Sequence, residues 1–387
     1  MKKSSKSALS TTVAVILTAV IVGSVVGGAT SYIFMSSTDS TVQEVRADVK
    51  AVADAIGVPV DKPDELKKLM DERKLIEAAR QEGKVVVYTQ GNPPTNDAVR
   101  RAFESRYPFI TVEFVVNAPG LPVADRFLSE SEKGGKSADV LNFNQVNIEQ
   151  ALAKGELLAK YTPRNTEWAT AELKDKGGRW VANGIILFSI AYNTKLVSKD
   201  QAPKSFQDLL DPKWSGKIVV GNPKANTLWA DLLKASERQY GEDFMRKLEA
   251  QKIRYYPPGE DTYAKLAAGE YSLLLFALPA FAEGRKAAGQ PMDWVRLSDN
   301  TYFQNLAMAV VVADAPHPNA ARLFVDWFFS KEGNQIRADT GGIVTMPGVR
   351  LASPDLALQG KKLIPVETLS DAERQAFFAK YPGLAAP

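Results

Sequence analysis

The stretch GKVVVYTQGNPPTNDAVRRAFESRYP, residues 83–108, decides the fold class. Its β-branched run at 84–88 predicts a buried strand, the Pro- and Gly-rich segment at 90–96 predicts a loop, and the apolar spacing at 97–108 predicts a helix. The order then recurs, because ITVEFVV and ADVL predict further strands and a helix begins near Ala124 between them. Such alternation predicts an α/β fold with a mostly parallel sheet, whose ligands gather at the carboxyl ends of the strands.

A second series of strands and helices follows. GIILFSIAYNT at 184–194 and NLAMAVVVA at 305–313 predict two long buried strands, and two strand–helix patterns lie between them, GKIVVGNP followed by a helix near Asn226, and SLLLFALPAFAEGRKAAG. Two α/β series joined by two long strands predict a hinged two-lobe protein. The expected boundaries are 83–187 plus 310–358 for lobe 1, 188–309 for lobe 2, and 359–387 for a C-terminal tail that packs on the lobes.

The N-terminal segment has a different character. No charged residue lies between Lys6 and Asp39, and the apolar stretch 11–35 is long enough to cross a hydrocarbon layer of ~30 Å. Three lysines precede it, so the positive-inside tendency predicts a cytoplasmic stub and transmembrane anchor at 1–38 and an extracellular or periplasmic globular part. A cleaved signal peptide is the alternative, although the apolar run exceeds the core of about 7–15 residues that such peptides have.

Residues 39–82 are expected to form a helical stalk or linker. Val42, Val45, Val49 and Val52 recur at helical spacing, and a polar amphipathic pattern resumes after Pro63. A solvated spacer and a short parallel coiled coil are both compatible with this pattern.

Composition narrows the function. The chain carries 48 basic and 45 acidic residues and no basic tract beyond the N-terminus, so nothing indicates a nucleic-acid partner. It has no cysteine, which excludes disulfides, a lipidated cysteine and a cysteine nucleophile. It has one histidine, His317, and no Gly-x-Ser-x-Gly motif, so no catalytic residue, cofactor or metal ligand is assigned. A surface hydrolase is kept as a remote alternative.

Several phrases together resemble one protein family. They are VVVYTQ, ADVLNF, GRWVANGIILFSIAYNT, SFQDLLDPKWSGKIVV, LAAGEYSLLL and ADAPHPNAARLFVDWFFSKEGNQ, in consistent order from about 85 to 347. This order resembles the type 2 periplasmic binding proteins, in particular the extracellular solute-binding family that includes ferric-ion binders. The resemblance implies a protein that captures a solute between two lobes and delivers it to the permease of an ABC importer.

The ferric branch of that family holds Fe(III) with a histidine, a glutamate and two adjacent tyrosines. By the resemblance these places fall at Asn92, at Asn144 and within Ala277-Leu278-Pro279. Fe(III) is a hard cation that needs anionic oxygen ligands, and these residues supply none. Tyr255-Tyr256 lies about twenty residues before the family position and is expected to be strand or rim packing. A ferric-ion binder with non-standard ligands therefore stays an alternative.

The anion half of the family site is better matched. The resemblance places an oxyanion at the N-terminus of the helix that follows the GKI strand, and this segment contains Asn222, Asn226 and Thr227. Unpaired N–H groups at a helix start favour anions. The alternative is that Asn226 or Thr227 only caps its own helix.

The predicted cleft is rich in amides and contains aromatic faces. Amides donate and accept hydrogen bonds, as hydroxyl groups require, and aromatic faces cover a carbon skeleton. We therefore expect a small polar organic solute or an oxyanion-bearing compound, although each asparagine has a turn-forming role as its alternative. The predicted ligand-binding residues are Thr89, Gln90, Asn92, Asn142, Phe143, Asn144, Asn222, Asn226, Thr227 and Phe276.

Overall fold

The computed structural model describes residues 63–116, 122–224, 226–256 and 261–385. The chain divides into two compact units, Met1–Glu77 and Ala78–Pro387. Of the first unit only part of helix α4 (Pro63–Glu82) is described, and it continues into the second. The expected transmembrane anchor and most of the expected stalk lie outside the described residues. Among the described residues, no helix is long and apolar enough to cross a membrane.

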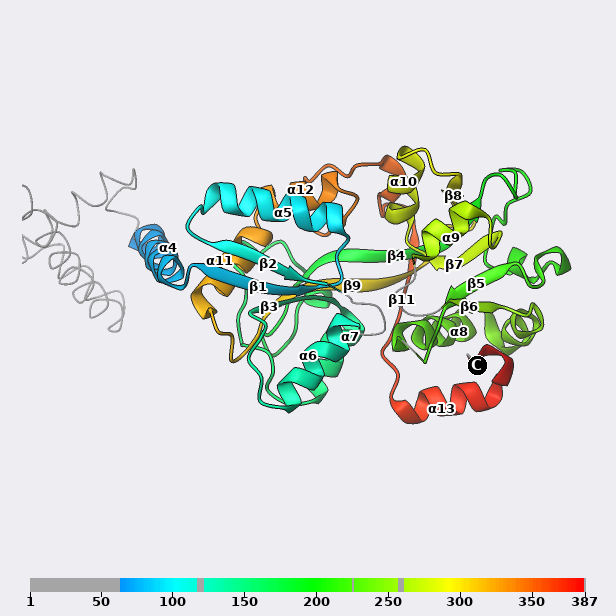
Figure 1. Cartoon of the computed structure of the whole chain (residues 1–387), viewed down its shortest axis with the longest axis horizontal. Helices are drawn as coiled ribbons and strands as arrows, with labels where there is room; N and C mark the ends of the chain where they lie inside the picture. Colours follow the sequence, from blue (N-terminus) through cyan, green and yellow to red (C-terminus); the bar gives the residue numbers. More distant parts are fainter. Residues whose placement is uncertain (1–62, 117–121, 225, 257–260, 386–387) are drawn as a thin grey trace, which may run out of the picture. The chain divides into compact units, whose positions relative to one another are not determined.

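Lobe 1 is built on three parallel strands. The β-branched run at 84–88 becomes β1, which pairs with β2 on one side and β3 on the other, with Val87 opposite Val140. Figure 1 shows α5 and α12 on one face of these strands and α6 and α7 on the other. The elements are β1 (Lys84–Thr89), α5 (Pro93–Arg106), β2 (Thr111–Val115), α6 (Val123–Glu132), β3 (Val140–Asn144), α7 (Gln145–Ala153), α11 (Pro318–Phe328), α12 (Lys331–Asp339) and β10 (Ile343–Val344).

Two long strands run from lobe 1 into lobe 2. The first half of β4 (Ala182–Asn193) pairs with β9 (Thr301–Val311), and its second half pairs with strands of lobe 2. Their antiparallel course can be followed in Figure 1. Beyond β4, β9 also pairs with β3, so both strands belong to the sheet of lobe 1. The expected lobe boundaries fall inside β4 and β9 and stay predictions.

Lobe 2 repeats the strand–helix pattern. Parallel strands β5, β6 and β7 lie side by side, and β7 pairs antiparallel with β4. Its interior is aromatic, with Phe206, Phe276 and Phe303 in mutual ring contact. The elements are β5 (Ile218–Gly221), α8 (Thr227–Ala250), β6 (Arg254–Tyr256), α9 (Thr262–Ala268), β7 (Leu273–Ala277), α10 (Pro279–Ala287) and β8 (Met292–Trp294), with 3-10 turns at Gln207–Leu210 and Pro212–Trp214. Outside lobe 2, 3-10 turns occur at Ala171–Leu173, Pro354–Leu356 and Pro382–Leu384.

The C-terminal tail contacts both lobes. Strand β11 (Lys362–Pro365) pairs with β9, and helix α13 (Asp371–Lys380) lies against α8, where Arg374 pairs with buried Asp231 at 3.3 Å. Thr368 donates a hydrogen bond to Glu149 of α7 in lobe 1. The tail therefore spans the junction.

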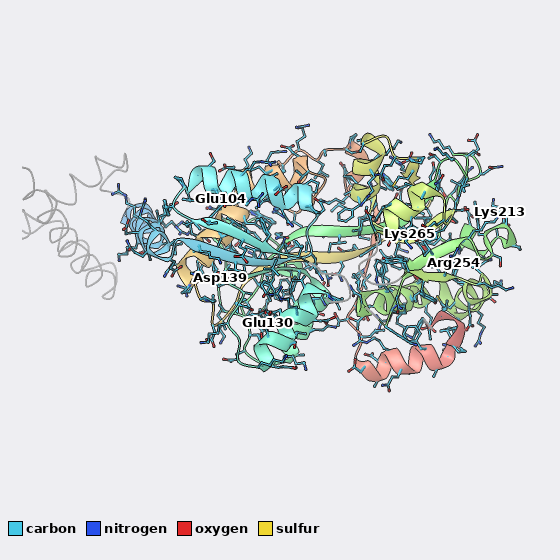
Figure 2. The ribbon with its side chains drawn as sticks, viewed as in Figure 1. Glu104, Glu130, Asp139, Lys213, Arg254 and Lys265 are labelled. Carbon is cyan, nitrogen blue, oxygen red and sulfur yellow. The ribbon has the colours of Figure 1, made fainter. Side chains whose placement is uncertain are left out.

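The histidine has a structural partner. Buried Asp139, labelled in Figure 2, accepts hydrogen bonds from the backbone N–H groups of Val86 and His317 at 2.7 Å each. Its second contact with His317 joins Oδ2 to the imidazole Nδ1 at 2.8 Å. These bonds hold the start of α11 against β1.

Candidate functional site

Two parallel strands of lobe 1 end in a shared cluster of amides. Gln90 follows β1 and Asn144 ends β3, and because the strands are parallel these residues meet at one edge. The Gln90 Oε1 atom accepts from the Asn144 backbone N–H at 3.0 Å and from Asn144 Nδ2 at 2.9 Å. Gln90 Nε2 donates to Asn147 Oδ1 at 2.7 Å. Asn144 also caps α7, since its Oδ1 accepts from the Asn147 N–H at 3.1 Å.

This amide cluster reaches the other lobe. Asn147 Nδ2 donates to Gln150 Oε1 at 2.9 Å, and Gln150 Nε2 donates to Thr227 Oγ at 3.0 Å. Thr227 is the first residue of α8 in lobe 2. A continuous chain of amides therefore connects the end of β1 to a helix N-terminus across the lobe junction.

Other predicted residues are engaged locally. Thr89 Oγ accepts from the Gly91 N–H at 2.9 Å and from Asn142 Nδ2 at 3.1 Å. Asn92 caps α5, with Oδ1 accepting from the Thr95 N–H at 2.8 Å. In lobe 2 the capping residue of α8 is Asn226, whose Oδ1 accepts from the Leu228 N–H at 3.0 Å, and Asn222 accepts from the Lys224 N–H at 2.8 Å.

A cavity of about 200 Å³ lies where the strand ends of lobe 1 face the start of α10 in lobe 2. It continues into a wider groove of about 810 Å³ between α5, α10 and the end of α12, because the cavity and the groove share lining residues such as Gln90 and Phe281. Residues of β4 and β10 line the opposite side of the cavity. The lining includes Gln90, Asn92, Asn142, Phe143, Asn144, Asn183, Ile185, Leu187, Leu278, Pro279, Phe281, Phe328, Arg337 and Ile343.

The start of α10 faces this cavity without a polar side chain of its own. Leu278 precedes the helix and Pro279 is its first residue, and no side chain among the described residues caps it. The Leu278 N–H instead donates to the Tyr263 hydroxyl at 2.7 Å. Burial raises the pKa of Tyr263, so its hydroxyl stays protonated. The lobe 2 wall is therefore apolar next to the amide-rich wall of lobe 1.

One charged residue, Arg337 of α12, lines the cavity. Its exposed fraction is 7%, and its guanidinium lies 4.3 Å from the Phe328 ring centroid. Nη1 donates to the Asn183 carbonyl at 3.0 Å and Nη2 to Asn334 Oδ1 at 2.6 Å, while Nε has no partner among the described residues. Burial lowers the pKa of Arg337 to about 9, so it is still charged at neutral pH.

Asn183 lies beside it at the start of β4. This residue is 1% exposed, and neither Oδ1 nor Nδ2 of its side chain has a partner in the described part of the chain. Sequence reasoning missed both residues. QIRAD reads as an ordinary polar helix end, and Arg337 becomes buried because the two-residue strand β10, just beyond α12, pairs with β4. No local signal in the sequence announces that pairing.

The predicted site residues divide into three groups. Gln90, Asn92, Asn142, Phe143 and Asn144 line the cavity, and Thr89 lines the adjoining groove. Asn222, Asn226 and Thr227, at or before the start of α8, do not line the cavity. Of these, Thr227 contacts lobe 1 by accepting a hydrogen bond from Gln150. Phe276 is 1% exposed inside the aromatic interior of lobe 2, where Phe206 and Phe303 cover it. Roles for all of these residues in holding a solute stay predictions.

Metal chemistry has little support in this region. Among the described residues, no group of three or more His, Cys, Asp or Glu side chains is arranged to hold a metal ion. The residues at the family's iron positions, Asn92, Asn144 and Leu278-Pro279, all line the one cavity. The residues at these positions therefore lie around the same cavity, but their side chains are neutral.

Residues 136–367 match the family described as bacterial extracellular solute-binding protein. Over 200 residues the chain is 24% identical to the Fe(3+)-binding periplasmic protein of Serratia marcescens, an alignment that covers 50% of this chain and 57% of the relative.

Two solved structures have the same fold. The substrate-binding protein of an ABC transporter from Agrobacterium tumefaciens superposes with a TM-score of 0.68 at 17% identity, covering 78% of this chain and 96% of that one. AfuA of Actinobacillus pleuropneumoniae, with fructose-6-phosphate bound, gives a TM-score of 0.65 at 24% identity, covering 77% and 97%. These likenesses confirm the two-lobe α/β fold. The family match, which spans more than half of the chain, shows that it belongs to the bacterial extracellular solute-binding proteins.

Proposed function

We propose that this protein captures a small polar organic solute, or a compound bearing an oxyanion, in the cavity between lobe 1 and lobe 2 and delivers it to an ABC permease. The observation that carries the proposal is the convergence of Asn92, Asn144 and Leu278 on one cavity. By the family resemblance, these three residues fall at positions where the ferric branch has metal ligands. Amides and an apolar wall suit a compound with hydroxyl groups and a carbon skeleton rather than a bare cation.

Closure of the lobes on the solute is the transport signal. Gln150 and Thr227 already meet across the junction, and β4 and β9 supply the connections about which the lobes turn. A solute that contacts both lobes favours the closed arrangement by its differential contacts. The permease then distinguishes the loaded from the empty protein.

Identification of the retained solute tests this proposal. The extracellular part is purified without added ligand and mildly denatured, and the released small molecules are analysed by mass spectrometry. We expect an intact polar or anionic compound in near-stoichiometric amount, which on return to the emptied protein reduces its radius of gyration. A compound that is chemically altered on return would instead support the surface-hydrolase alternative.

The N-terminal segment holds this protein at the membrane. Support comes from the uncharged stretch 11–35, the lysines before it and the absence of a cysteine for lipidation. Full-length protein should stay with membranes after high salt and alkaline washing, whereas a shortened chain that starts at Thr41 should be soluble. Mature protein that begins after the apolar stretch would establish a cleaved signal instead.

A ferric-ion binder with non-standard ligands is the second candidate. It is favoured by the name of the Serratia relative, and it is opposed by the neutral side chains at the family's ligand positions. The two candidates differ in what the cavity must neutralise: a trivalent cation needs anionic ligands, whereas an organic anion needs a cation.

A further inference from the structure

Arg337 is a buried cation without a described counter-ion. Three neutral acceptors receive its guanidinium protons: the carbonyl of Asn183, the side chain of Asn334 and, at 3.4 Å, the carbonyl of Phe328. No carboxylate among the described residues pairs with it. Other buried charges of the protein are paired, as Asp231 is with Arg374. A buried charge is costly unless a partner of opposite sign or a full set of hydrogen bonds compensates it.

Asn183 provides the second observation, and it is independent of the charge. Within the described part of the chain, neither the oxygen nor the nitrogen of its buried amide has a partner, whereas the neighbouring amides of Gln90 and Asn144 are bonded to one another. Unsatisfied buried polar atoms are uncommon, and each requires an explanation. Arg337 touches the main chain of Asn183, and both residues line the same cavity.

We propose that Arg337 and Asn183 form a seat for the anionic group of the bound solute. A carboxylate or phosphate oxygen accepts from Arg337 Nε and Asn183 Nδ2, and Asn183 Oδ1 accepts from a hydroxyl or amine next to the anionic group. The seat lies on β4 and α12, away from the start of α8 where the family resemblance places an oxyanion. This inference rests on the proposed solute capture and specifies the charge of the solute.

A purely structural arginine is the competing explanation, because Arg337 also ties α12 to β4 and to the end of α11. The two explanations differ at Asn183, whose side chain makes no hydrogen bond within the described protein. Asn183→Leu keeps the volume and the carbonyl that Arg337 contacts. If the seat exists, this variant folds as well as the parent or better but loses anion binding; if Arg337 is only structural, anion binding is unchanged.

The experiment uses the extracellular part stripped of solute, with malate, glycerol 3-phosphate and inorganic phosphate as probes and glycerol as the neutral control. Melting temperature and calorimetric affinity are measured for the parent, Asn183→Leu and Arg337→Met. We expect at least one anion, and not glycerol, to stabilise the parent, with affinity reduced about 10- to 100-fold in either variant, as for a lost hydrogen bond to a charged group. Comparison of the affinities for malate and for glycerol 3-phosphate shows whether the seat prefers a carboxylate or a phosphate.

Arg374→Met is the matched control. It removes another little-exposed arginine, outside the cavity, so it should lower the melting temperature while leaving the anion-induced rise intact. Anions that stabilise Asn183→Leu as much as the parent would overturn the seat, as would a parent that no anion stabilises. In either case a neutral solute recovered by mass spectrometry would leave the proposed solute capture standing, so the two failures can be told apart.

Discussion

The amide cluster of lobe 1 and the Arg337–Asn183 pair face the same cavity but differ in how their polar atoms are used. In the cluster, Gln90, Asn144 and Asn147 bond to one another. In the pair, the arginine Nε and both amide atoms of Asn183 have no described partner. The cluster therefore stabilises the lobe 1 wall of the cavity, whereas the pair has hydrogen-bonding atoms available for a solute.

The difference separates two meanings of a polar residue near a cleft. A satisfied amide that caps a helix contributes to the fold whether or not a solute is present. An unsatisfied amide beside an unpaired cation costs stability in the empty protein, and a ligand repays that cost. Substitutions in the two regions should therefore have opposite effects on stability and affinity.

The largest effect on stability is expected from Asn144→Leu. The variant loses the cap of α7 and removes the hydrogen bonds that Asn144 makes to half-buried Gln90 and buried Asn147, which should destabilise the protein by about 2–4 kcal/mol. The matched variant Asn183→Leu removes no hydrogen bond that the described residues make, and it should be neutral or stabilising. Denaturant unfolding of both measures the contrast. Equal losses would show that Asn183 has a partner after all and would remove the distinction between the two regions.

Much of this scaffold can be predicted from the sequence. The β-branched run before Thr89 and the long apolar stretch from Gly184 form strands because their side chains are buried, and that pattern is local. Asn92, Asn144 and Asn226 stand before helices, and each caps its helix. Capping was the alternative role considered for Asn226, whereas a turn-forming role was considered for Asn92 and Asn144. Local patterns thus predicted the strands that lie around the cavity.

The polar atoms with unused capacity could not be predicted in this way. Arg337 lies in a helix whose sequence is typical of a solvated surface, and its burial depends on β10 meeting β4 about 160 residues away in sequence. The burial of Phe276 under Phe206 and Phe303 also depends on long-range packing. Both outcomes arise from tertiary contacts, which a local pattern does not encode.

A third polar network surrounds Glu237 of α8. Its hydrogen-bonding groups are paired, as in the amide cluster, but the Glu237 carboxylate can be protonated at low pH. Burial by itself raises the pKa of Glu237, but hydrogen bonds from Lys234, Lys380 and Tyr381 outweigh it and lower the pKa to about 2. The folded state then binds fewer protons than the unfolded one, so this stabilisation is present above the unfolded value near 4.5 and is lost as pH falls toward 2. We expect a loss of about 1–3 kcal/mol over that window.

Urea unfolding between pH 5 and pH 2 checks this dependence. Glu237→Gln should be less stable than the parent at pH 5. Its free energy of unfolding should also depend less on pH in acid, because the variant has no carboxylate at this position to protonate. Glu132→Gln, which alters an exposed pair with Lys154, should follow the parent curve. If Glu237→Gln retains the full acid dependence, the network around α13 is not its source.

A smaller effect on solute affinity is expected at the hydrogen bond between Gln150 and Thr227, which connects the amide cluster of lobe 1 to lobe 2. Thr227→Val keeps the shape of the side chain and removes only the acceptor for Gln150 Nε2. If this bond helps to hold the lobes closed, solute affinity should fall by ~0.5–1.5 kcal/mol, with little change in stability. Asn226→Ala should instead lower stability by ~1 kcal/mol through its cap.

Calorimetry with the recovered solute and scattering with and without it measure both variants. Unchanged affinity in Thr227→Val together with Asn226→Ala would mean that the start of α8 neither holds the solute nor stabilises closure. In that case the prediction that Asn222, Asn226 and Thr227 bind ligand would have to be abandoned.

For ferric ion we expect no effect on the protein. Ferric ion added with or without phosphate or citrate should leave the protein colourless and its melting temperature unchanged, because a ligand that does not bind the native state cannot stabilise it. The tyrosines outside the family position are poorly suited to replace the missing ligands. Tyr255 donates its hydroxyl proton to the Leu384 carbonyl at 2.7 Å, and burial raises its pKa, which disfavours the phenolate that iron requires. A visible charge-transfer band that disappears in the Tyr255→Phe, Tyr256→Phe double variant would place an iron site there, and the cavity beside Arg337 would then have to serve another purpose.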